Sequence, residues 1–281
     1  MLQARTTALT CLAMIAFAGN SLLCRYALKE TDIDPGSFTV IRLVAGAVML
    51  WLIVRLRSGP RDGGGNWLSA LALFGYAAGF SFAYASLPAA TGALLLFGAV
   101  QVTMVGHGLW RGERLHGWQW GGAVLAFAGL VGLLLPGLSA PSLQGALLML
   151  GAGVAWGIYS LRGRGAGDPT QVTAGNFLRT LPIALVLLPW FYSHVSFDGL
   201  GVLCAIASGA LASGIGYAIW YTALPRLRAT TAATVQLSVP VLAALGGVAL
   251  LAEPVTVRLG LSAIAVLGGI ALVILQGRAR R

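Results

Sequence analysis

Charged residues are scarce in this chain: Asp, Glu, Lys and Arg make up only 9% of its 281 residues, whereas 58% are hydrophobic. Soluble domains carry roughly 25% charged residues, because their surfaces face water. So little charge cannot cover a soluble fold, and lipid must therefore surround much of the surface. The composition predicts an integral membrane protein whose first partner is the lipid bilayer.

The groups that build common catalytic and metal sites are also missing. No HExxH motif and no close His/Cys cluster occurs, so we expect neither a metal nor a cofactor. The three cysteines have no paired spacing, and small buried thiols are the expectation for them. No acidic residue lies in the middle of an apolar run, which counts against a proton-driven pump for cations and against Asp-rich Mg²⁺-diphosphate enzymes. The eight acids all fall in loops or at the ends of runs: Glu30, Asp32, Asp34, Asp62, Glu113, Asp168, Asp198 and Glu253.

Ten apolar runs are long enough to cross a bilayer, which takes about 20 residues of helix. They fall near 6–28, 35–56, 67–87, 90–110, 117–136, 143–161, 171–192, 198–222, 229–251 and 257–276. Pro88 and Pro225 divide two stretches that are too long for single spans, because proline ends or kinks a helix. The sequence predicts an all-α protein with ten transmembrane helices.

The net charge of +10 could indicate nucleic-acid binding, but the basic residues lie in short loops between apolar runs and form no stripe. Cytoplasmic loops of membrane proteins carry an excess of Lys and Arg. With the N-terminus inside, 13 of the 18 basic residues are cytoplasmic: Arg5, Arg55, Arg57, Arg61, Arg111, Arg114, Arg162, Arg164, Arg226, Arg228, Arg278, Arg280 and Arg281. Only 3 lie outside: Arg25, Lys29 and Arg258. The asymmetry predicts cytoplasmic N- and C-termini and no nucleic-acid partner.

Landmarks of the first half recur in the second half at an offset of 137 residues: Ala18 with Ala155, Arg25 with Arg162, Arg42 with Arg179, and Leu87-Pro88 with Leu224-Pro225. Near the end of each copy the offset becomes 140, where Glu113 corresponds to Glu253. The sequence therefore predicts a first five-helix repeat over residues 1–138 and a second over residues 139–281. Because five is an odd number, the second copy enters the membrane from the opposite side, and inverted halves of this kind are typical of secondary transporters.

Aromatic residues four apart form a stripe on the third span, and the eighth span repeats it. Buried tyrosines need hydrogen-bond partners, which a cavity for an amphipathic solute provides, although a lipid-facing stripe is the alternative. Polar amides in three spans are poorly tolerated against lipid, so they too should point inward, either to a substrate or to a neighbouring helix. The candidate substrate-binding residues are Asn20, Tyr76, Phe80, Tyr84, Gln101, Trp156, Tyr159, Tyr217, Tyr221 and Gln236.

Arg42 and Arg179 are cations inside predicted spans, and each needs a facing hydroxyl or carbonyl. Either could recognise a substrate carboxylate, but their equivalent places in the two copies favour a structural role. Pro240 follows Gln236 by one turn and should kink the ninth span, where a hinge is a hypothesis.

Each copy resembles the EamA-type repeat of the drug/metabolite transporter superfamily. The first span of each copy ends on a basic residue (AGNSLLCR, AWGIYSLR) and the second carries an Arg (FTVIRLVAGA, NFLRTLPIAL). A Gly/Ala-Glu pair precedes the fifth (GERLHGWQWGG, AEPVTVRLGL). One departure is Val100, where the second copy has Pro240.

The chain looks most like the bacterial aromatic amino acid exporters of that superfamily. This resemblance implies a multi-pass protein of the bacterial inner membrane that exports amino acids through a central cavity. A single chain with both halves favours a monomer. Two alternatives remain: a carrier of nucleotide sugars, sugar phosphates or other metabolites, although Lys29 is the only lysine, and, more remotely, an intramembrane enzyme using Ser208 or Ser213.

Overall fold

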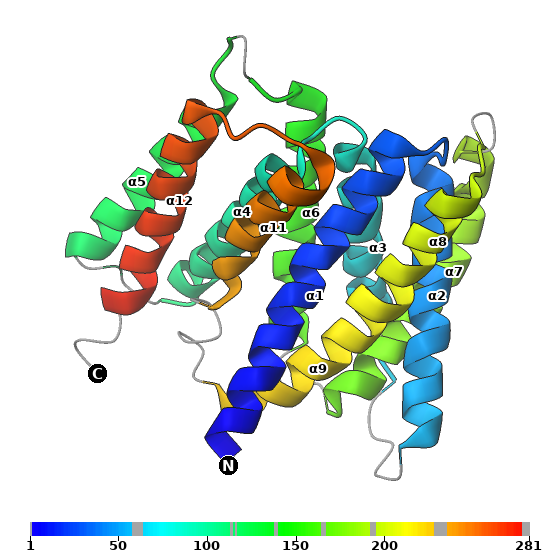
Figure 1. Ribbon diagram of the computed structural model, residues 1–281. Helices are drawn as coiled ribbons and strands as arrows, with labels where there is room; N and C mark the ends of the chain where they lie inside the picture. Colours follow the sequence, from blue (N-terminus) through cyan, green and yellow to red (C-terminus); the bar gives the residue numbers. More distant parts are fainter. Residues whose placement is uncertain are drawn as a thin grey trace.

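The computed structural model describes residues 2–57, 64–112, 115, 117–137, 140–163, 167–191, 195–227 and 235–276. Within these ranges all regular secondary structure is helical, and ten segments follow one another if Gly199–Arg226 counts as one (Figure 1). The first six are α1 (Leu2–Glu30), α2 (Pro35–Leu56), α3 (Trp67–Tyr84), α4 (Ala89–Trp110), α5 (Gly117–Leu134) and α6 (Leu143–Arg162). After α7 (Pro169–Phe191) and the eighth segment come α11 (Ser238–Leu251) and α12 (Val257–Gln276).

Eight helices of the described ranges are long and apolar enough to cross a membrane. The prediction of an all-α, multi-pass membrane protein is thereby confirmed. The helix α11 has 14 residues, and the first part of the run predicted near 229–251 lies outside the described residues. The inverted relation of the two halves and the cytoplasmic termini stay predictions.

The eighth segment is more complex than the plain span that the sequence predicted. It runs from α8 (Gly199–Ala207) through a π-helical stretch, η2 (Ser208–Ile215), into α9 (Gly216–Ala223) and a short 3₁₀ turn, η3 (Leu224–Arg226). Its glycines and alanines allow η2 to lie directly on α2, since a Cβ at Gly209 would collide with the backbone of Arg42. Wide helical turns of this kind occur frequently at functional sites.

Several helices begin at a side chain that caps them, which explains why the predicted boundaries agree closely with the observed ones. Asp34 accepts a hydrogen bond from the backbone N–H of Ser37 at the start of α2, at 2.9 Å. Asn66 caps α3 in the same way, and Asp198 caps α8. Pro88 lies directly before α4, where its missing N–H costs nothing.

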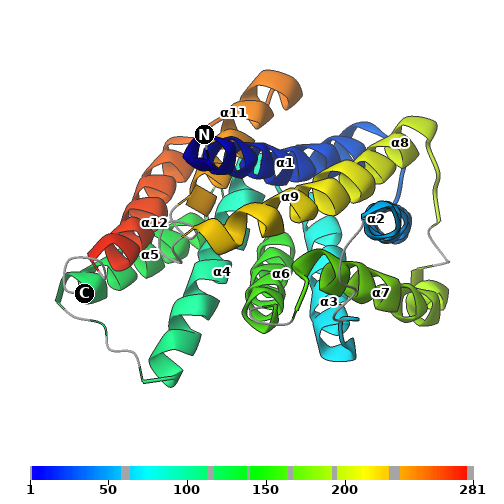
Figure 2. The ribbon, with the colours of Figure 1, turned by 90° about the horizontal axis from the view of Figure 1, so that it is seen from below.

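The helices form one bundle with a pair at its edge (Figures 1 and 2). In its centre α6 packs against α3 and α4, while α1 packs against α11 and α9. On one side α2 lies against α7 and η2. At the opposite edge α5 and α12 pack mainly on each other. They meet at Gly122 and Gly269, where a Cβ at Gly122 would lie 2.6 Å from the carbonyl oxygen of Gly269.

Two further expectations fall within the described ranges. The helical turn at Val235–Gln236 is interrupted at Leu237, within the turn that precedes Pro240, as a proline without an N–H requires. The interruption is compatible with the expected kink, and the kink and its use as a hinge stay predictions. The expectation of buried thiols is wrong for Cys11, which is exposed on α1, because no neighbouring helix covers that face; Cys24 and Cys204 are buried.

Candidate functional site

A small cavity lies between helices of the first and second halves of the chain. Its walls come from α1, α3 and α4 on one side and from α6 and α9 on the other. The free volume is about 20 Å³, enough for one water molecule, so a larger solute requires the walls to separate. The lining residues are Phe17, Asn20, Ser21, Tyr76, Phe80, Leu96, Phe97, Trp156 and Tyr217.

Aromatic rings make up most of the cavity wall. The Trp156 ring lies between Tyr76 and Tyr217, with ring centroids 4.8 and 5.0 Å away. Phe80 packs against Tyr76 on the next turn of α3, at 5.4 Å. Phe17 of α1 contacts Tyr217 edge-on. Tyr76 and Phe80, which are four residues apart on α3, are both buried. The alternative that this aromatic stripe faces lipid is therefore wrong at these two residues.

A polar network connects the cavity to its supporting helices. Asn20 donates from Nδ2 to the Tyr76 hydroxyl, at 3.3 Å. Its Oδ1 accepts a hydrogen bond of 2.5 Å from Ser208 of η2. The tyrosine oxygen also accepts a 3.0 Å hydrogen bond from Nη2 of Arg42. The Tyr217 hydroxyl is buried and faces that of Tyr76, and it makes no well-aligned hydrogen bond among the described residues.

Arg42 lies directly behind the aromatic wall and is only 2% exposed. Its guanidinium carbon is 4.7 Å from the ring centroid of Phe80 and 5.2 Å from that of Tyr76. The facing hydroxyl that the sequence required is thus Tyr76. Nη1 has no hydrogen-bond partner, and no acid in the described part of the chain forms an ion pair with this cation.

Arg179 has a different environment, although it is the equivalent residue in the second copy. It is half-buried, and its Nη1 donates to the carbonyl oxygens of Gly64 and Gly175. The guanidinium lies 6.0 Å from the ring centroid of Trp67 at the start of α3. These contacts tie α7 to the segment before α3, away from the cavity.

Five of the ten predicted site residues line the cavity: Asn20, Tyr76, Phe80, Trp156 and Tyr217. The other five do not. Tyr84 is buried against Phe80 and donates to the carbonyl of Ala89. Tyr159 packs on Trp156 and accepts from Asn176.

The remaining three also lie away from the cavity lining. Tyr221 is partly buried near Gly163 at the end of α6. Gln101 is 3% exposed, and its Nε2 has no hydrogen-bond partner among the described residues. Gln236 is partly buried just before α11.

Four lining residues, and the residue that hydrogen-bonds Asn20, were not predicted from the sequence. Phe17, Ser21, Leu96 and Phe97 are small or apolar side chains of the kind that every span carries, so no signal marks them. Ser208 is different, because serine beside glycine in an apolar run indicates close helix packing. No cluster of three or more His, Cys, Asp or Glu that could hold a metal ion occurs among the described residues.

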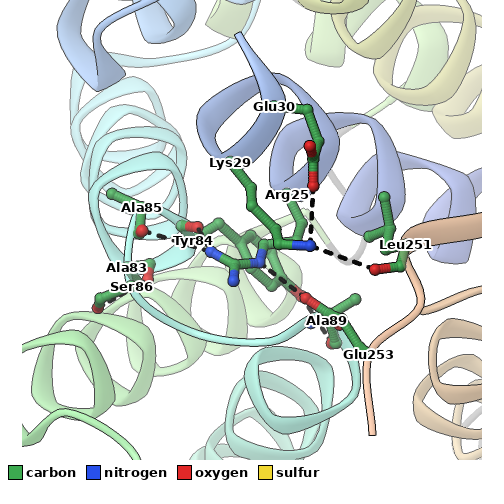
Figure 3. A network of polar contacts seen from close by, with 10 residues as sticks. All are labelled: Arg25, Lys29, Glu30, Ala83, Tyr84, Ala85, Ser86, Ala89, Leu251 and Glu253. Atoms are coloured by element: carbon green, nitrogen blue, oxygen red, sulfur yellow. Dashed lines mark hydrogen bonds and ion pairs between the residues drawn. The ribbon is translucent and has the colours of Figure 1, made fainter. Parts of the chain in front are cut away.

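A second polar network, unforeseen from the sequence, joins helices at the end of the molecule where α1 finishes (Figure 3). Arg25 pairs with Glu253 at 2.8 Å, and both side chains are largely buried. Arg25 also donates to the carbonyl of Tyr84, and the second oxygen of Glu253 accepts from the backbone N–H of Ala89. Lys29 donates to the carbonyl of Leu251. The network connects α1, the turn between α3 and α4, and the segment between α11 and α12.

Known proteins are similar to this chain in sequence, and a solved structure is similar to it in fold. An uncharacterized protein of Pseudomonas aeruginosa is 61% identical over 251 residues, which cover 89% of this chain and 88% of that protein. The threonine/homoserine exporter RhtA of Escherichia coli K12 is 38% identical over 138 residues, 46% of this chain and 45% of the exporter. One crystal structure has the same fold, with a TM-score of 0.69, 22% identity and 98% of each chain covered.

The sequence pattern of the EamA-like transporter family matches the chain twice, over residues 5–135 and again over residues 143–275. Together the two matches span nearly all of the described helices. The chain therefore belongs to the EamA-like transporter family and is a multi-pass membrane transporter.

Proposed function

We propose that this protein exports amino acids, aromatic and other neutral ones among them, from the cytoplasm across the bacterial inner membrane. The observation that carries the proposal is the cavity, whose wall combines stacked rings with polar tips and includes no acidic residue. Such a wall suits a solute that is apolar at one end and polar at the other. The likeness of half the chain to a threonine/homoserine exporter supports the same class of cargo.

Alternating access between two inverted halves, residues 1–138 and 139–281, is the mechanism we propose. The cavity receives side chains from both halves, as a site between opposed repeats should. Its small volume means that α3, α6 and α9 must separate on one side and then on the other as the solute passes. With both termini in the cytoplasm, the Arg25–Glu253 network closes the outer end. One chain contains both halves, so a monomer suffices.

Flux in proteoliposomes tests the proposal. Vesicles with the purified protein should release radiolabelled Phe, Met or Thr faster than protein-free vesicles. Flux no faster than in protein-free vesicles for every amino acid tested would contradict amino acid export. If anionic sugar phosphates compete with amino acids for flux, the alternative metabolite carrier gains support. Repeating the measurement with an imposed pH gradient distinguishes facilitated diffusion from proton exchange.

A tryptophan pair tests whether the cavity is the pathway. Trp156→Ala removes the ring between two tyrosines. We expect the amino acid concentration that half-saturates flux to rise about tenfold or more, which corresponds to about 1.4 kcal/mol of binding free energy. Trp118→Ala removes an equally large ring that is 73% exposed on α5, so flux should stay unchanged. Equal flux in both variants would place the pathway elsewhere.

A further inference from the structure

The charge of Arg42 has no counterpart in the described part of the chain. A guanidinium stays ionised in proteins, and a buried ion is costly unless it is paired. Three features ease the cost here: the Tyr76 hydroxyl and the faces of two aromatic rings. None of them carries a negative charge, and one nitrogen of the guanidinium has no hydrogen-bond partner among the described residues. The site is therefore electropositive.

Hydrogen-bond accounting shows where that charge is directed. A hydroxyl has one hydrogen to donate and two lone pairs to accept with. The Tyr76 oxygen accepts from both Arg42 and Asn20, so both lone pairs are used and its hydrogen remains to be donated. Tyr76 and Tyr217 both line the cavity, and the buried Tyr217 hydroxyl faces that of Tyr76. Because only one hydrogen can be shared between the two hydroxyls, the other hydrogen and the adjacent cation lack an acceptor among the described residues.

The comparison with Arg179 shows that this arrangement is not an architectural requirement of the repeat. Its guanidinium uses backbone carbonyls, which are the usual partners of a structural arginine. Arg42 is instead enclosed by the side chains that form the cavity wall.

We propose that Tyr76 and Tyr217 bind a carboxylate group, and that Arg42 supplies the balancing charge from behind Tyr76. This inference rests on the proposed function and names its ligand class. Because no lining residue is acidic, the carboxylate is the required group and the α-ammonium is not. The site takes monocarboxylates with an apolar side chain, including acids without an amino group. Arg42 acts here as a positioning residue for Tyr76, and not only as a structural one.

Three ligands of one shape test the proposal: L-phenylalanine, 3-phenylpropionate without the ammonium, and 2-phenylethylamine without the carboxylate. In competition with phenylalanine flux, 3-phenylpropionate should be effective within about tenfold of phenylalanine itself. The amine should be weaker by roughly 10–100-fold, the factor that corresponds to a charge-assisted hydrogen bond. If the amine competes as well as the carboxylate, the proposal is wrong.

Variants separate the positioning role from a merely structural one. Arg42→Gln should remove the preference for 3-phenylpropionate over the amine, and Arg42→Lys should restore part of it. Arg179→Gln is the matched control and should keep the preference unchanged. Should Arg42→Gln fail to fold, Tyr76→Phe takes its place, because it keeps the ring and removes the donated hydrogen. A variant at Arg42 or Tyr76 that keeps the full preference would overturn the proposal.

Thermal unfolding of the purified protein distinguishes this inference from the proposed function. A ligand that binds the folded state raises the unfolding temperature without any need for transport. If 3-phenylpropionate stabilises the wild type and not Arg42→Gln while no amino acid is transported, the carboxylate site stands and amino acid export fails. Suppose instead that phenylalanine is transported, but 2-phenylethylamine competes with its flux and raises the unfolding temperature as well as 3-phenylpropionate does. Export then stands and the carboxylate site fails.

Discussion

Neutralising Glu253 should open the end of the molecule that the Arg25–Glu253 pair holds closed. The two side chains are 11% and 8% exposed, and their atoms lie 2.8 Å apart. Glu253 also accepts the backbone N–H of Ala89 at the start of α4. In Glu253→Gln, Arg25 keeps the carbonyl of Tyr84 as an acceptor but loses its counter-ion.

The structure gives the size of the effect. Removing one partner of a buried ion pair costs about 3–5 kcal/mol, because the other charge is left uncompensated. The remaining carbonyl and the slight exposure of Arg25 reduce this to about 2–3 kcal/mol. At 1.4 kcal/mol for each factor of ten, the ratio of open to closed molecules rises by roughly 30–140-fold.

Cys24 provides the assay, since it precedes Arg25 and is fully buried in the closed arrangement. With Cys11→Ser and Cys204→Ala as the background, a membrane-impermeant maleimide reports how often this end opens. Labelling of Glu253→Gln should be faster than in the background protein by the same 30–140-fold. Glu30→Gln is the control, because Glu30 pairs with Lys29 at an exposed position and such pairs contribute about 0–1 kcal/mol. Equal labelling rates in the two variants would refute the reasoning.

Three further experiments test the packing, hydrogen bonding and capping described above. Gly209→Ala should overpack the contact between η2 and α2, cost about 1–3 kcal/mol and lower the thermal unfolding temperature, whereas Gly19→Ala, with nothing within 4 Å, should not. In a double-mutant cycle, Asn20→Ala and Ser208→Ala should show a coupling of about 1 kcal/mol in unfolding free energy, and a coupling near zero would exclude their hydrogen bond. Asp34→Ala should lose about 1 kcal/mol through the cap of α2, most of which Asp34→Asn should retain, as measured by chemical denaturation.

The helices could be predicted from the sequence because their limits depend on local chemistry. Asp34 caps α2 and Asn66 caps α3, each directly before an apolar run, and Pro88 separates α3 from α4. The π-helical stretch could not be predicted, since its backbone depends on contact with α2 and not on the residues of η2 alone.

Half of the residues predicted for the site line the cavity, and the others lie away from it for a common reason. Spacing by four assigns residues to a face of a helix but not to a depth along it. Tyr76, Phe80 and Tyr84 share a face, yet only the first two line the cavity. Arg42 and Arg179 show what an internal repeat cannot predict. Both lie on the second helix of their copy, but the neighbouring side chains differ between the two halves and determine the environment of each arginine.

The pairing of α5 with α12 has a consequence for how the protein is made. α5 emerges midway through synthesis, yet its main partner is the last helix described, α12. The contact between Gly122 and Gly269 forms only after α12 has been made, and until then the face of α5 that contains Gly122 lacks its main partner. Assembly of the first half is therefore completed only when the final helix enters the bilayer. A chain that stops before α12 is expected to leave α5 as a substrate for membrane proteases.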